Sequence, residues 1–231
     1  MSDREVVIVD DVAGAAAERI AAAVGAGAHI SLSGGSTPRR AHEKVAAMGL
    51  DWSGVEVWFS DDRAVPPDHE HSNYLMAKQS LLDHVFPGAV HRIHGELGHE
   101  AAADAYEAEL MAGFGDGVPS LDLVLLGLGP DAHTASLFPG GDALGERERL
   151  AVGVETPGMA PLVSRVTLTL PVLNAGKEVV FLISGEDKAE AVARAFGDAP
   201  GPDAPASLVR PEPGNLTLLL DPPAAARLGA G

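Results

Sequence analysis

Short apolar segments alternate with longer amphipathic, alanine-rich segments along this chain of 231 residues. Continuous or alternating apolar runs are typical of strands, whereas apolar residues spaced three and four apart are typical of helices. Strand, helix and strand in succession predict an α/β fold, a Rossmann-like open and mostly parallel sheet with helices on both faces. The predicted strands are residues 6–9, 30–32, 55–59, 90–93, 121–128, 179–183 and 216–220, and the predicted helices are residues 13–24, 38–48, 73–85, 100–111 and 186–196.

The charge of the chain restricts its partners. It has 33 acidic against 16 basic residues and a formal net charge of −17. Such a surface repels nucleic acids and anionic membranes, so we expect neither as a partner. The same field repels a phosphorylated substrate, so a phosphate site has to be built from local donors.

Length and cysteine content set further limits. An apolar content of 46% in 231 residues suits a single α/β domain over residues 1–231. The absence of cysteine excludes disulfides and thiolate metal sites, and it suits a reducing compartment. Because the first residues hold no apolar stretch long enough for a signal peptide, we expect a cytoplasmic protein. The sequence leaves open whether it is a monomer or a homodimer.

Residues 121–128 form the most apolar strand candidate, and polar residues follow it directly. Gly127 and Gly129 are followed by Pro130, Asp131 and His133. In open α/β sheets, ligands bind just past the carboxyl ends of the strands. Asp131 and His133 are therefore candidate catalytic residues. The alternative is that Asp131 caps the next short helix and His133 packs there as a structural histidine.

A glycine- and serine-rich loop at 33–38 follows the strand at 30–32. Its glycines allow close backbone approach, Thr37 can cap a helix, and Pro38 suits the first helical turn. Free N–H groups at a helix start bind anions, which makes this loop a candidate phosphate site. The alternative is an ordinary strand-to-helix turn. The candidate donors in it are Ser33, Gly34, Gly35, Ser36 and Thr37.

Three charged residues, Asp61, Asp62 and Arg63, follow the strand at 55–59. Arg63 can donate to a carbonyl oxygen or oxyanion, with the aspartates positioning its side chain. The alternative is a solvated loop with a local ion pair. Since three such loops leave strand ends of the same kind, we expect them to converge at one edge of the sheet.

Several other sites are excluded. Pro130 interrupts the glycine pattern of a dinucleotide fold, and the acidic residue expected about 20 positions later is missing. No Gly-x-Ser-x-Gly elbow of a serine hydrolase is present. His69, Glu70 and His71 read as loop, and His91 and His94 fall on a predicted strand with their side chains on different faces. Neither group therefore predicts a metal site.

Five segments of the chain together resemble the 6-phosphogluconolactonases and the wider superfamily that includes glucosamine-6-phosphate deaminase. The matching segments are SGGSTP at 33–38, WFSDDRAVPPDHEHSNY at 58–74, LGLGPDAHTASLFP at 126–139, RVTLTLPVLNA at 165–175 and PASLVRPEPGNL at 205–216.

The resemblance implies cofactor-free hydrolysis of 6-phosphoglucono-δ-lactone to 6-phosphogluconate, a step of the pentose phosphate pathway, on the fold of the deaminases and lactonases. It implies that His133 is the general base, that Asp131 orients the imidazole, and that Arg63 steadies the oxyanion or the sugar hydroxyls. The phosphate would lie on the 33–38 loop. The remaining residues expected to bind substrate are Asp61, Asn73, Arg165 and Lys188.

Two positions depart from the family pattern. The family commonly has Lys-Pro-Pro-Pro ahead of the Arg-Val-Thr segment, where this chain has Ala160 and Pro161. Lys188, Arg165 or Arg39 must then compensate for the missing lysine. The other departure is Ala132, where a glycine is usual; if the position needs a positive φ, the alanine costs about 1 kcal/mol.

Two alternative functions stay open. A sugar-phosphate deaminase or isomerase on the same fold resembles this chain at the Asp-x-His loop, but such enzymes have a glutamate where this chain has Phe138. A non-catalytic sugar-phosphate-binding regulator would keep the 33–38 loop and lose the Asp131 and His133 pair, which is present here.

Overall fold

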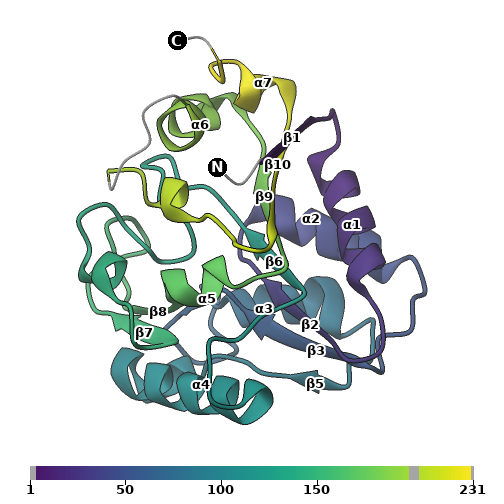
Figure 1. Cartoon of the computed structure of the whole chain (residues 1–231). Coiled ribbons are helices and arrows are strands. Elements are labelled where there is room, and N and C mark those ends of the chain that lie inside the picture. Colours follow the sequence, from purple (N-terminus) through teal and green to yellow (C-terminus); the bar gives the residue numbers. More distant parts are fainter. Residues whose placement is uncertain (1–3, 198–202, 230–231) are drawn as a thin grey trace.

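A computed structural model describes residues 4–197 and 203–229 of the chain. Its centre is a seven-stranded sheet in which each neighbouring pair of strands is parallel. Helices lie on both faces of this sheet (Figure 1), so the predicted fold class is confirmed. In spatial order the strands are β1 (Glu5–Ile8), β10 (Asn215–Leu220), β9 (Glu178–Ile183), β6 (Leu123–Leu126), β2 (Ala28–Leu32), β3 (Val55–Phe59) and β5 (Ala89–Val90).

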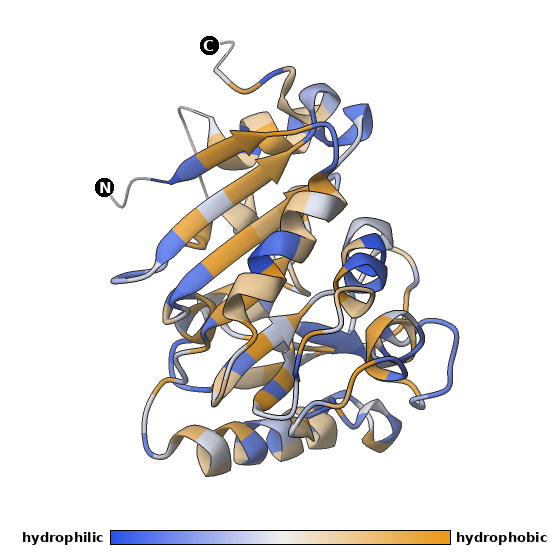
Figure 2. Ribbon diagram, turned by 90° about the vertical axis from the view of Figure 1, so that its right-hand side faces the viewer, coloured by the Kyte–Doolittle hydropathy of each residue, from blue (hydrophilic) through white to orange (hydrophobic). Residues whose placement is uncertain are grey.

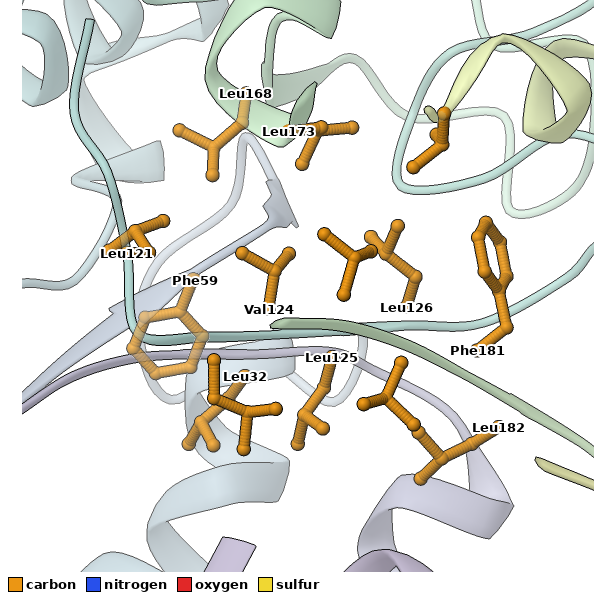
Figure 3. Close-up of a cluster of buried hydrophobic side chains, with 14 of the residues drawn as sticks. Leu32, Phe59, Leu121, Val124, Leu125, Leu126, Leu168, Leu173, Phe181 and Leu182 are labelled. Atoms are coloured by element: carbon orange, nitrogen blue, oxygen red, sulfur yellow. The ribbon is translucent and has the colours of Figure 1, made fainter. Parts of the chain in front are cut away.

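The central strands are apolar on both faces because helices or loops cover both. All four residues of β6 are fully buried. Figure 3 shows Val124, Leu126 and Phe181 on one side of the sheet, with Leu125 and Leu182 on the other. Figure 2 shows the same pattern as strands that are apolar along most of their length. A parallel sheet buried on both faces requires such near-continuous apolar runs.

The helices are mostly short. Figure 1 shows α1 and α2 on one face of the large sheet and α5 and α6 on the other. No helix in the described ranges, 4–197 and 203–229, is long and apolar enough to cross a membrane. The helices are α1 (Val12–Ala23), α2 (Ser36–Ala46), α3 (Asn73–Ala77) with its π-helical continuation Lys78–Leu82, α4 (His99–Phe114), α5 (Leu170–Asn174), α6 (Ala189–Phe196) and α7 (Pro222–Ala225).

A second, antiparallel sheet of three strands lies at the carboxyl end of the large one. Its strands are β4 (Asp61–Arg63), β8 (Arg165–Leu168) and β7 (Ala151–Val154). Ser60 joins the two sheets, because its N–H donates to the carbonyl of Leu32 and its carbonyl accepts from the N–H of Leu168, both at 2.9 Å. The chain thus passes from β3 of one sheet into β4 of the other.

The alternation of segments does not predict the second sheet or α5. The charged segment 61–63, expected as a loop, is β4, and it has no apolar alternation because its pairing with β8 supplies the order. The strand expected at 90–93 is only Ala89–Val90. The run of proline, glycine and alanine at 198–205 predicts a surface loop, but it lies mostly outside the described residues, and its last residue, Pro205, opens a short 3₁₀ turn.

His91 and His94 consequently lie beyond β5, and the expectation that they occupy opposite faces of a strand is wrong. Both rings approach Glu109 of α4, His91 through Nδ1 at 3.2 Å and His94 through Nε2 at 3.5 Å. Within residues 4–197 and 203–229, no group of three or more histidine and acidic side chains is arranged to hold a metal ion.

One buried histidine gives the fold a predicted sensitivity to acid. His42 of α2 is fully buried; its Nδ1 contacts the Ser80 hydroxyl at 3.2 Å, and its Nε2 has no partner in the described part of the chain. Burial lowers the pKa of His42 from 6.5 to about 4. The unfolded chain therefore binds a proton between pH 6.5 and 4 that the folded chain does not, and stability is lost as the pH falls through this range.

We expect the free energy of unfolding to fall by about 2 to 3 kcal/mol between pH 7 and 4.5 because of His42. Urea unfolding of the wild type and of His42→Leu at both pH values measures this contribution. The variant lacks the His42 titration, and all other titrating groups are the same in the two proteins. An equal loss in both proteins would contradict the assignment.

Candidate active site

The loops that follow β6, β2 and β9 lie together because these strands are neighbours in a parallel sheet. A Cβ atom added to Gly127, after β6, would lie 4.0 Å from both the Ser33 hydroxyl and the Gly34 carbonyl, after β2. The loop with the Asp131 and His133 pair is therefore in contact with the glycine- and serine-rich loop. The expected convergence of these two loops at one edge of the sheet is present.

Asp131 and His133 form a hydrogen-bonded pair. His133 Nδ1 lies 2.5 Å from Asp131 Oδ1, and the backbone N–H of His133 donates to the same oxygen at 3.1 Å. This fixes the imidazole with Nδ1 toward the carboxylate and leaves Nε2 without a hydrogen bond among the described residues. Asp131 caps no helix, so the structural alternative for it does not describe this loop. The pair can act as a carboxylate-oriented general base.

The loop around His133 has an unusual backbone. Ala132 has φ 66° and Ala135 has φ 47°, both in the left-handed region that glycine adopts more readily. The sequence predicts a cost for alanine at position 132 if this residue has a positive φ, and the structure shows that it does. Strain of this kind persists where surrounding contacts hold it, and it is concentrated at functional sites.

Ala132→Gly is expected to raise the free energy of unfolding by up to about 1 kcal/mol, because glycine adopts this φ without steric cost. Denaturant unfolding of the two proteins measures the difference. If Ala132→Gly instead lowers the free energy of unfolding by about 0.5 to 1 kcal/mol, as glycine does in place of alanine in a helix, residue 132 gains nothing from the freedom of glycine at positive φ.

Arg63 is held by groups other than the ones the sequence suggests. Its Nη1 donates to the carbonyl of His71 and to Asn73 Oδ1, both at 2.8 Å. Asn73 Nδ2 in turn donates to the carbonyl of Asp61 at 2.9 Å and to Asp61 Oδ1 at 3.2 Å. Asp61 therefore contacts Asn73, which in turn accepts from Arg63, so this aspartate acts on the guanidinium indirectly.

Asp62 stabilises the backbone of this segment. Its carboxylate accepts the N–H groups of Arg63 at 2.7 Å, Asn73 at 2.6 Å and Tyr74 at 3.0 Å. Burial raises the pKa of Asp62 to about 6, against these three donors, which lower it. Asp62 thus fixes β4 against the start of α3, which places Asn73 beside Arg63.

Asp61 connects the β4 segment to the loop after His133. Its Oδ2 accepts from the Ser136 hydroxyl at 2.6 Å, and the Ser136 N–H donates to Thr167 Oγ1 in β8 at 3.2 Å. Ser136 is a site residue that sequence reasoning missed. A serine inside an apolar run carries no local signal of such a distant contact.

Arg165 lies directly opposite Arg63 in the pairing of β8 with β4. It is buried, and its only hydrogen bonds in the described chain are long ones from Nη2 to the carbonyls of Met159 at 3.3 Å and Pro161 at 3.4 Å. Neither arginine has a carboxylate within 4.0 Å among the described residues, and the Nε atoms of both are buried without a partner. Burial lowers the pKa of Arg165. Burying two guanidinium groups without a carboxylate partner costs folding free energy, unless an anion binds to them.

The glycine- and serine-rich loop leads into α2 differently from the prediction. The helix begins at Ser36, Gly35 is the N-cap with φ 111°, and no side chain caps the helix, so the expected cap by Thr37 is wrong. The N–H groups of Ser36 and Thr37 therefore stay available to an anion. Arg39 pairs with Glu43 at 3.2 Å along the helix surface.

Lys188 lies in the turn that follows β9. Its Nζ lies 3.5 Å from Asp187 Oδ2, and this neighbour is its one ion-pair partner in the described ranges. Gly185 before it has φ 110°, similar to Gly35, but Glu186 and Asp187 occupy the first turn there. Acidic residues at that helix start already balance its dipole, which leaves the start of α2 as the better anion site.

Phe138 is a second contact that the sequence does not reveal. Its ring centroid lies 4.5 Å from that of His133, and the Arg165 guanidinium lies over the ring at 5.3 Å from its centroid. The apolar pattern around it predicts only a core residue. In the structure it contacts both the candidate base and a buried cation.

Known proteins are similar to this chain over most of its length. The family model described as glucosamine-6-phosphate isomerases/6-phosphogluconolactonase matches residues 3–218. A 6-phosphogluconolactonase of a Nostoc species is 41% identical over 208 residues, covering 86% of this chain and 84% of that protein. The human 6-phosphogluconolactonase is also 41% identical, covering 86% of this chain and 80% of its own length.

Solved structures show the same fold. A 6-phosphogluconolactonase from Trypanosoma cruzi superposes with a TM-score of 0.89 at 28% identity, covering 99% of this chain and 98% of the other. A monomeric glucosamine-6-phosphate deaminase superposes with a TM-score of 0.82 at 22% identity, covering 96% of this chain and 99% of the other. The second likeness is one of fold alone.

Proposed function

This chain belongs to the family of glucosamine-6-phosphate isomerases and 6-phosphogluconolactonases, and from that premise we propose that it hydrolyses 6-phosphoglucono-δ-lactone to 6-phosphogluconate in the pentose phosphate pathway. The observation that carries the proposal is the Asp131 and His133 pair. Phe138 packs on the imidazole, and Asp131 is the one carboxylate that contacts it among the described residues. The relatives named above support a lactonase over a deaminase.

His133 acts as the general base in this proposal. Nε2 takes a proton from a water molecule as the water oxygen bonds to C1 of the lactone, and Asp131 stabilises the resulting imidazolium. When the tetrahedral intermediate collapses, the bond from C1 to the ring oxygen breaks and the imidazolium returns its proton to that oxygen. The new carboxylic acid then releases a proton to solvent.

Arg63 and Arg165 supply the positive charge that this reaction needs. Negative charge develops on the C1 oxygen only as the water attacks, so preorganised cations that lack another partner stabilise the transition state more than the neutral lactone. Asn73 and Asp61 hold Arg63 in place rather than contact the reacting atoms. All of these groups come from the chain itself, and the proposed reaction uses no cofactor.

The phosphate of the substrate binds at the loop of residues Ser33 to Thr37. Supporting observations are the uncapped start of α2 and the contact of this loop with the loop of Asp131 and His133. Lys188 supplies a cation from the turn after β9, in place of the family lysine that is absent at Ala160. The enzyme is expected to act in the cytoplasm, as a monomer or a homodimer.

Lys188→Ala is expected to raise KM about tenfold with little change in kcat, because a phosphate loses one partly exposed charge contact in both ground and transition states. Ala160→Lys added to this variant should restore part of the affinity. Lys177→Ala is the matched control, since Lys177 pairs with Asp122 at the opposite end of the sheet. An unaltered KM in Lys188→Ala would move the phosphate contact to Arg165 or Arg39.

The proposed activity is tested by following freshly generated 6-phosphogluconolactone with and without the protein, corrected for its spontaneous hydrolysis. We expect hydrolysis well above the spontaneous rate and no release of ammonia from glucosamine 6-phosphate. Ammonia release without lactone hydrolysis would identify a deaminase, and binding of sugar phosphates without either reaction would identify a regulator.

A further inference from the structure

Phe138 separates the candidate active site from a neighbouring hollow in the protein. Its side chain is only 4% exposed. On the active-site side it contacts the His133 ring and the Arg165 guanidinium, as described above. On the other side it lines, with Ser136, a hollow of about 690 Å³ between α4, β7 and the loop after Phe138.

The wall of the hollow is strongly acidic. His99 and Arg149 are the basic side chains on its wall, and Arg149 is already paired with Asp104 at 2.6 Å. Its acidic lining residues are Glu100, Asp104, Asp142, Glu146 and Glu155.

This arrangement explains how Arg165 stays unpaired in a chain of net charge −17. A guanidinium that is paired with a carboxylate has less of its charge and fewer of its donors left for a ligand. The acidic groups that act on Arg165 over longer distances are Asp61 and Asp62 rather than those of the hollow. Arg165 has no carboxylate within 4.0 Å among the described residues, although five line the hollow beyond the ring. The ring face attracts the guanidinium by a cation–π interaction while offering it no acceptor that would neutralise it.

The ring itself is fixed by the chain that surrounds it. A Cβ atom at Gly158 would lie 3.3 Å from Phe138 Cδ1, so the backbone there packs directly on the ring. The Gly141 N–H donates to the Phe138 carbonyl at 3.0 Å. The aromatic face is therefore a rigid surface, against which His133 and Arg165 both rest.

We propose that Phe138 is a positioning residue of the lactonase reaction: an apolar partition that holds the Arg165 guanidinium over its ring and keeps it free of the carboxylates in the hollow, so that the charge of Arg165 is directed to the substrate. The inference rests on the proposed function. Phe138 thus affects kcat/KM through Arg165 and does not touch the substrate.

A double-mutant cycle tests the connection. We expect Phe138→Ala to lower kcat/KM about 30-fold in the wild type but less than about threefold in an Arg165→Met background, because the two residues act as one unit. Phe138→Leu keeps an apolar barrier without an aromatic face, and it should lose about fivefold in the wild type and nothing in the Arg165→Met background. Phe138→Tyr, which keeps the ring, should retain most of the activity.

Phe181→Leu is the matched control for loss of a buried aromatic ring, since Phe181 packs on Phe196 away from the site. It should lower Tm without changing kcat/KM. Equal losses for Phe138→Ala in both backgrounds would overturn the proposal and leave Phe138 as a core residue. If Phe138→Ala does not fold, the cycle with Phe138→Leu decides in the same way. Absence of lactone hydrolysis by the wild type would contradict the proposed function instead.

Discussion

His133→Ala is expected to lower kcat for lactone hydrolysis by roughly 10² to 10⁴-fold, the usual contribution of a positioned general base. The imidazole is the only basic group hydrogen-bonded to Asp131 in the described part of the chain, and its Nε2 is free to accept a proton. Without it, water must attack the lactone unassisted, although the arginines and the phosphate loop still bind the substrate.

Steady-state rates and inhibition by 6-phosphogluconate distinguish catalysis from binding in this variant. We expect kcat to fall while the inhibition constant of the product stays within a few-fold of the wild-type value. His84→Ala is the matched control, because His84 lies on an exposed turn and its Nε2 contacts the Gln79 carbonyl at 3.0 Å. A change of less than about threefold in kcat would exclude His133 as the base.

Gly129→Ala is expected to lower kcat by roughly 10²-fold without removing any functional group, because it displaces the pair that does the chemistry. A Cβ atom at this position would lie 2.0 Å from His133 Nδ1 and 2.7 Å from Asp131 Oδ1. Both distances are far below van der Waals contact. The imidazole has to swing away from the carboxylate, and displacements of about 1 Å are enough for losses of this size.

Kinetics together with a thermal melt separate this effect from unfolding. Gly145→Ala is the matched control, since an added Cβ there has no heavy atom within 4 Å. The control should keep its activity. Wild-type kcat in Gly129→Ala would show that the hydrogen bond of Asp131 to His133 is not needed for turnover, and the proposed orientation of the base would have to be abandoned.

The sequence alone determines the elements whose signals are local. The apolar run of β6 predicts a strand buried on both faces, because such a strand must be apolar at every position rather than at alternate ones. Glycines and prolines after it predict a turn at a strand end, where Asp131 and His133 lie two residues apart. Their hydrogen bond depends on few other residues, and so this pair could be predicted as a candidate site.

The setting of the two arginines is decided only by the tertiary structure. Arg63 and Arg165 are about 100 residues apart, and their juxtaposition depends on the register of β4 with β8, two short strands of which β4 has no apolar alternation. The links of Asn73 to Arg63 and of Ser136 to Asp61 arise from the same pairing. Phe138 reads as a core residue in the sequence, because burial is encoded locally by apolarity, whereas what a buried ring contacts depends on how distant segments pack.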